Sequence, residues 1–165
     1  MRKKILNEKG FTLIEIIISL MLVGIIAVFA GMGIVSVAKG FLFTKTNAET
    51  VQKGQAAFTR LVKEFTVISS VTSGTSTSIS FTSYKSALSE AHSVSWAGAG
   101  TDLLLDGDIL TDNVSAFELA YYDSYDGPKE LTWFSTRTII EITLTLAGAN
   151  NIDSVFAARV APRNL

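Results

Sequence analysis

The stretch that decides how this chain is built is Lys9-Gly10-Phe11-Thr12-Leu13-Ile14-Glu15, which joins a short basic leader to a long apolar run. The apolar run covers residues 11–38, and Glu15 is the only ionisable side chain in it. As a helix it would be about 42 Å long, whereas the hydrocarbon core of a bilayer is about 30 Å thick. The sequence therefore predicts a membrane-spanning helix with one acidic residue near its start.

That acidic residue needs a reason to be there. A carboxylate inside an apolar span costs about 2.5–3.5 kcal/mol on insertion scales, and such residues usually serve a function. Glu15 is therefore a candidate functional residue whose partner is missing from the span. Gly10, just ahead of the run, offers a small residue where a processing enzyme could reach the backbone.

Charge is unevenly distributed along the chain. The leader carries four basic residues and one acidic residue, whereas residues 70–165 carry five basic and eleven acidic ones. Basic residues ahead of a span place the N-terminus in the cytoplasm and the C-terminal portion outside. An acidic C-terminal portion without a basic stripe argues against contact with nucleic acid.

Few residues offer catalytic chemistry. The chain has no cysteine, which excludes disulfides and thiolate chemistry, and it has no glycine-rich phosphate loop followed by lysine. The single histidine, His92, lies among serines and is expected to be solvated or at the end of a strand. Four aspartates at even spacing lack the distal glutamate of a calcium loop, and turn chemistry explains them better: Asp102, Asp106, Asp108 and Asp112. We expect no enzyme activity, cofactor or metal.

Three interpretations of the N-terminus compete. An ordinary secretory signal could be cut after Val28-Phe29-Ala30, but its apolar core would be too long and would contain Glu15. An uncleaved anchor for a lone domain explains the length of the run but not Glu15. The third interpretation is a prepilin, because Gly10-Phe11-Thr12-Leu13-Ile14-Glu15 closely resembles the type III signal of type IV pilins and pseudopilins.

The resemblance implies a maturation pathway and an assembly role. In that family a membrane prepilin peptidase cleaves after the glycine, here between Gly10 and Phe11, and the new N-terminal residue is N-methylated. The Glu15 carboxylate of one subunit would then meet the amine of Phe11 in another. Residues 1–10 would be the leader and residues 11–38 the transmembrane and assembly helix.

Beyond the span, the sequence predicts an amphipathic continuation of the helix over residues 39–70. Apolar residues recur there at steps of three and four between charged ones, and Gln55 interrupts them. The helix is expected to end near Ser69-Ser70, and its apolar stripe to pack on the following domain. The stripe consists of Phe41, Ala48, Val51, Phe58, Val62 and Phe65, with Leu61 and Ile68 beside it.

Residues 71–165 are expected to form a β head domain. The Ser/Thr/Gly-rich run 69–78 has no helical pattern, and past Ser78 the pattern changes to a period of two, which is typical of strands. About six short strands are predicted to form one small antiparallel sheet, with a hairpin turn at Asp106-Gly107-Asp108. The predicted strands are 78–84, 93–96, 102–105 with 109–110, 114–122, 138–146 and 155–160. The resulting fold class is α+β, with a long N-terminal helix packed against a small β head.

The order of these segments resembles the J-type pseudopilins of type II secretion and the W-type minor pilins. In that group a strand like Val114–Tyr122 ends in a tyrosine–aspartate pair, and the chain closes with an arginine–asparagine pair like Arg163-Asn164. An aromatic cluster is expected to serve core and edge packing by default, or a subunit or substrate contact: Tyr121, Tyr122, Tyr125, Trp133 and Phe134.

The expected function is a structural minor pilin or pseudopilin subunit of a type IV pilus-like or type II secretion filament. Expected partners are a prepilin peptidase, other pilin subunits, an inner-membrane assembly platform and membrane lipid. The chain would cross the cytoplasmic membrane once, with its head outside, before it enters a filament. The alternative is a membrane-anchored extracytoplasmic binding domain or enzyme with no role in a filament.

Overall fold

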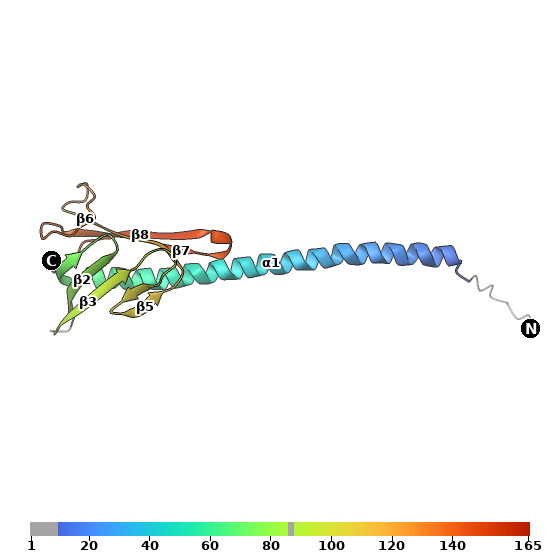
Figure 1. Cartoon of the computed structure of the whole chain (residues 1–165), viewed down its shortest axis with the longest axis horizontal. Coiled ribbons are helices and arrows are strands. Elements are labelled where there is room, and N and C mark those ends of the chain that lie inside the picture. The colour runs from blue at the N-terminus through green and yellow to red at the C-terminus, as the bar shows by residue number, and fades with distance from the viewer. Residues whose placement is uncertain (1–9, 86–87) are drawn as a thin grey trace, which may run out of the picture. The chain divides into compact units, whose positions relative to one another are not determined.

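The computed structural model describes residues 10–85 and 88–165, and it confirms the predicted α+β class. One long helix, α1 (Leu13–Thr66), is followed by eight strands and one short 3-10 turn, η1 (Ala149–Asn151). Figure 1 shows this order of elements along the chain. By its internal contacts the chain divides into two compact units, residues 1–42 and 43–165, of which the second holds all the strands.

The strands form two antiparallel sheets rather than the single sheet that the sequence predicted. The first sheet contains β1 (Ile68–Gly74), β2 (Ser78–Lys85), β3 (Leu88–Trp96), β4 (Leu103–Leu105) and β5 (Asp108–Thr111), in that order. The second contains β6 (Val114–Tyr122), β7 (Ile139–Ala147) and β8 (Asp153–Val160). Asn113 separates them with a left-handed backbone (φ 55°), which interrupts the strand direction between β5 and β6.

Two boundaries differ from the prediction. The helix ends at Thr66, and β1 begins at Ile68, inside the stretch predicted to be helical and then irregular. The pairing of β1 with β2 has register shifts between Ile68 and Ser70 and between Val71 and Ser73, so the period-two pattern of this Ser/Thr-rich strand is broken. β3 is also longer than predicted, because it begins at Leu88.

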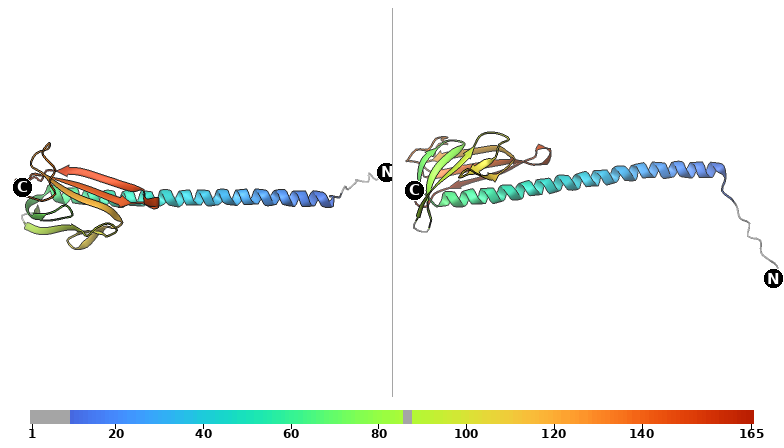
Figure 2. Two further views of the ribbon diagram at one scale, coloured as in Figure 1. Left: turned by 45° about the horizontal axis from the view of Figure 1, so that its top comes forward. Right: turned by 60° about the horizontal axis from the view of Figure 1, so that its bottom comes forward.

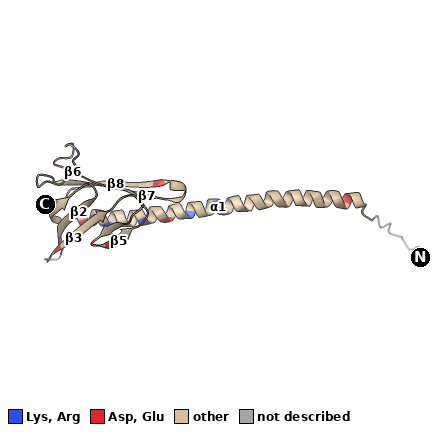
Figure 3. Ribbon diagram, in the orientation of Figure 1, with Lys and Arg blue, Asp and Glu red and all other residues tan. Residues whose placement is uncertain are grey.

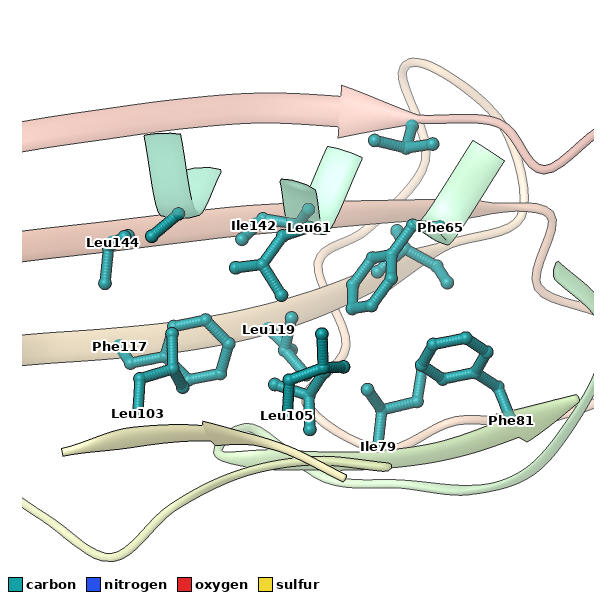
Figure 4. Packing of buried hydrophobic residues seen from close by; sticks show 14 of the residues in the cluster. Leu61, Phe65, Ile79, Phe81, Leu103, Leu105, Phe117, Leu119, Ile142 and Leu144 are labelled. Atoms are coloured by element: carbon teal, nitrogen blue, oxygen red, sulfur yellow. The ribbon is translucent and has the colours of Figure 1, made fainter. Parts of the chain in front are cut away.

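The core of residues 43–165 lies between α1 and the two sheets. Leu61 and Phe65 of α1 are fully buried, and Phe65 packs edge-on against Phe81 of β2 with ring centroids 5.4 Å apart. Figure 4 shows these side chains pointing into one interior with Leu119 of β6. The right-hand view in Figure 2 shows the strands lying along one side of the C-terminal part of α1. β7 contributes its predicted face: Ile140, Ile142, Leu144 and Leu146.

The buried face of α1 is displaced from the predicted stripe. Ala48 and Val51 are exposed and Phe58 and Val62 half-buried, whereas the buried residues are Gly54, Ala57, Leu61, Glu64 and Phe65. Small residues replace large ones where the sheet comes nearest. A Cβ atom added at Gly54 would lie 2.4 Å from the Phe156 ring and 2.7 Å from Leu146. The close approach of the Phe156 and Leu146 side chains to the helix therefore favours glycine at this position.

Candidate functional site at the start of the helix

The predicted processing residues lie immediately before α1. Gly10, Phe11 and Thr12 are outside the helix, and Leu13 is its first residue. The side chain of Phe11 is 78% exposed. The peptide bond between Gly10 and Phe11 therefore lies in non-helical backbone, two residues ahead of the helix.

Thr12 ends the non-helical segment as the N-cap of α1. Its side-chain oxygen accepts a hydrogen bond from the Glu15 amide at 3.3 Å, and its carbonyl accepts from the amides of Glu15 and Ile16 at 3.1 and 3.2 Å. This satisfies one of the amides that the start of a helix leaves unpaired. None of the sequence predictions includes this cap, although the spacing Thr12-x-x-Glu15 ahead of an apolar run is the signature that would have found it.

Glu15 occupies the first turn of α1, where a carboxylate is favoured by the positive end of the helix dipole. Its side chain is exposed and has no hydrogen-bond or ion-pair partner among residues 10–85 and 88–165. The dipole gives Glu15 a local stabilising role, but it does not neutralise the charge. In an apolar environment an unpaired carboxylate is costly.

Around Glu15 the surface of the helix is almost entirely apolar. Every described residue of 10–42 is exposed, and the sequence has no charged residue between Glu15 and Lys39. In Figure 3 the N-terminal part of α1 is accordingly almost all tan. α1 has the length and hydropathy of a membrane-spanning helix. The apolar N-terminal helix thus fits a membrane-anchored protein, because so large an apolar surface is unfavourable in water.

In the head, His92 is neither solvated nor at a strand end, so that prediction is wrong. It lies within β3, its side chain is 15% exposed, and its ring packs against Phe81 with centroids 5.6 Å apart. Its Nδ1 atom is 2.7 Å from the carboxylate of Asp106, which can only accept, so Nδ1 carries the proton. The sequence could not place this pair, because its members come from β3 and from the turn after β4.

Asp106 itself is part of a turn, as predicted. Asp106 and Gly107 both have a positive φ, 58° and 87°, which is the backbone of a tight two-residue hairpin turn between β4 and β5. Burial raises the pKa of Asp106, but hydrogen bonds from His92 and the Ser93 amide, with the charges of His92 and Arg60, outweigh burial and lower the pKa below its ordinary value. The pair is thus a structural link between β3 and the turn.

The aromatic cluster divides between core and surface. Tyr121 and Tyr122 are buried, and Trp133 packs edge-on against Tyr121 with centroids 5.5 Å apart. Tyr125 and Phe134 are exposed. The Tyr121 hydroxyl donates to the Thr75 carbonyl at 2.9 Å, which ties the turn after β1 to β6. Packing therefore accounts for three of the five aromatic residues.

A groove of about 610 Å³ runs between α1 and the hairpin of β4 and β5. Lys53 and Arg60 of the helix line it, but Lys53 forms an ion pair with Asp112 at 3.1 Å. No group of three or more potential metal ligands occurs in residues 10–85 and 88–165. The Thr111 hydroxyl, which also lines the groove, donates to the Asp112 carbonyl at 3.5 Å.

Comparison with known proteins gives a family match at the N-terminal segment. No curated protein matches the chain. Residues 5–31 match the family described as the prokaryotic N-terminal methylation motif, and this segment contains Gly10, Phe11, Thr12 and Glu15. The motif indicates a prepilin-type substrate of a prepilin peptidase and supports a type IV pilin-like protein.

Proposed function

We propose that the chain is a minor structural subunit of a type IV pilus-like or type II secretion filament. The proposal depends on two observations together. Residues 5–31 match the methylation motif, and the apolar part of α1 within residues 10–42 is exposed throughout. A separate head with its own core completes the arrangement. Such a chain is a substrate for maturation and a building block, and it performs no catalysis of its own.

Maturation takes place at the start of the helix. The peptidase hydrolyses the bond between Gly10 and Phe11, which leaves a carboxylate on Gly10 and a new amine on Phe11. N-methylation of Phe11 keeps that amine basic and cationic. The accessible, non-helical backbone at Gly10 and Phe11 supports cleavage at this bond.

In the filament, the Glu15 carboxylate pairs with the cationic Phe11 amine of a neighbouring subunit. The carboxylate has no partner among the described residues, and its position in an apolar span makes an unpaired charge costly. Pairing across subunits offsets that cost and favours one helix register over others. Membrane lipid surrounds the helix before assembly, and an inner-membrane platform transfers the subunit into the filament.

The experiment compares Glu15→Ala with Glu49→Ala in cells that carry a complete assembly system. Both glutamates lie on α1, but Glu49 forms an exposed pair with Lys45 at 3.9 Å. We expect both variants to be processed, and only Glu15→Ala to be depleted from sheared filaments, as measured by immunoblot. Incorporation of Glu15→Ala at the wild-type level would contradict the pairing.

The second candidate function is a membrane-anchored binding domain, which the groove between α1 and the β4–β5 hairpin favours. A binding domain needs the anchor but not cleavage after Gly10. A Gly10 variant that resists cleavage would retain its activity in that case, whereas it would stay out of filaments if the chain is a pilin-like subunit.

A further inference from the structure

We infer that Thr12 is a positioning residue for cleavage: its side chain fixes the start of α1 so that the bond between Gly10 and Phe11 stays outside the helix. The inference rests on the proposed processing and adds a residue to it. It follows from the observed cap, in which the Thr12 hydroxyl accepts from the Glu15 amide at 3.3 Å and the helix begins at Leu13.

The chemistry of hydrolysis explains why the helix start matters. A peptidase must polarise the carbonyl of Gly10 and direct water at its carbon atom. If α1 began one turn earlier, this carbonyl would accept the hydrogen bond of the Ile14 amide, four residues on. The bond to be cut would then be folded into the helix, with its carbonyl oxygen occupied. In the observed structure the Ile14 amide lies in the first turn and Gly10 is non-helical.

The cap competes directly with that extension of the helix. The first amides of α1 need acceptors, and near an apolar membrane the cost of leaving them unpaired is high. The Thr12 side chain supplies one acceptor locally. The same amide also donates to the Thr12 carbonyl at 3.1 Å, so loss of the hydroxyl removes one of its two acceptors. A helix extended by one turn, in which this amide pairs with the Phe11 carbonyl, then becomes more favourable. Gly10 opposes the added turn because glycine is a poor helix former, so the two residues act in the same direction.

The test separates capping from recognition of the shape of residue 12. Thr12→Val keeps the shape of the side chain and removes the acceptor, whereas Thr12→Asn changes the shape and keeps a good cap. Thr12→Ser keeps both a cap and a small side chain. Each full-length variant is expressed in membranes, and the initial rate of cleavage by a prepilin peptidase is measured by intact mass.

We expect Thr12→Ser and Thr12→Asn to be cleaved within about twofold of the wild type, and Thr12→Val to be cleaved about fivefold more slowly, the factor that loss of a typical N-cap corresponds to. In detergent micelles, the Cα chemical shift of Phe11 should move toward helical values only in Thr12→Val. Wild-type cleavage of Thr12→Val, or slow cleavage of Thr12→Asn, would overturn the inference while the proposed function stands. If the wild type itself is not cleaved after Gly10, both fall.

Discussion

The two units of the chain differ in whether their apolar side chains are buried or exposed. In residues 10–42 all the apolar side chains are exposed, whereas in residues 43–165 many of those on α1 and both sheets, among them Leu61 and Phe65, enclose a common core. The head therefore covers much of its apolar surface with its own residues, whereas no described residue covers the apolar side chains of residues 10–42. The difference teaches that the head buries its apolar side chains within itself, whereas under the proposed function residues 10–42 would acquire their packing from lipid or from other subunits.

The largest expected effect comes from making one substitution in both units. Phe65 is fully buried and Phe29 is 71% exposed. Phe65→Ala should lower the free energy of unfolding of the head by about 3–5 kcal/mol, because it leaves a cavity. Phe29→Ala should leave it unchanged. Both tryptophans, Trp96 and Trp133, lie in the head, so urea unfolding followed by tryptophan fluorescence in detergent reports on that unit alone. If Phe65→Ala and Phe29→Ala lowered the stability of the head equally, the contrast between a buried core and an exposed helix would be wrong.

A smaller effect on the stability of the head is expected from alanine substitutions at two glycines of α1, Gly54 in the second unit and Gly31 in the first. An alanine at Gly54 would press on Phe156 and Leu146, whereas nothing lies within 4 Å of a Cβ atom added at Gly31. Overpacking lowers the free energy of unfolding by about 1–3 kcal/mol, whereas the better helix propensity of alanine raises it by about 1 kcal/mol.

Gly54→Ala should therefore destabilise the head by about 1 kcal/mol, and Gly31→Ala should not shift its urea midpoint. The same fluorescence measurement checks both variants. A head that gains stability from Gly54→Ala would show that the close approach of β8 to the helix can relax.

The smallest expected effect is that of Asp106 on the pH dependence of the stability of the head. The pKa of Asp106 is lowered in the folded state, so the stabilisation is complete above the unfolded pKa of about 3.9 and is lost as the pH falls through the lower, folded value. Asp106→Asn keeps a residue that tolerates the left-handed turn, where φ is 58°. Its melting temperature should fall less steeply below pH 4 than that of the wild type. Parallel curves would mean that the link to His92 does not stabilise the head.

Much of this architecture could be predicted from the sequence, and the failures have physical causes. The long helix, the hairpin at Asp106-Gly107 and the strands β6 and β7 follow from clear periodicity and turn chemistry. β1 was not predictable in this way, because register shifts disturb the alternation of its apolar residues. The buried face of α1 differs from the predicted stripe because it includes Gly54 and Ala57. Their side chains are too small to stand out in a hydrophobic pattern.

In the candidate site, too, some residues could be predicted from a local motif and others could not. Gly10, Phe11 and Glu15 were predicted from a local motif, and residues 5–31 match the corresponding family. Their roles in cleavage and pairing stay predictions, because they depend on an enzyme and on other subunits. The Thr12 cap is also local, but its meaning depends on where the helix begins, which the sequence pattern placed at residue 11 rather than at Leu13. The pair of His92 and Asp106 required the fold.

The most direct test of the account is the N-terminus of the mature protein. The chain is expressed in cells that contain a prepilin peptidase, extracted from membranes, and analysed by intact mass and N-terminal fragmentation. The account predicts a chain that runs from Phe11 to Leu165 with one added methyl group on the Phe11 amine. A chain that retains residues 1–10, or one that begins after Ala30, would contradict it.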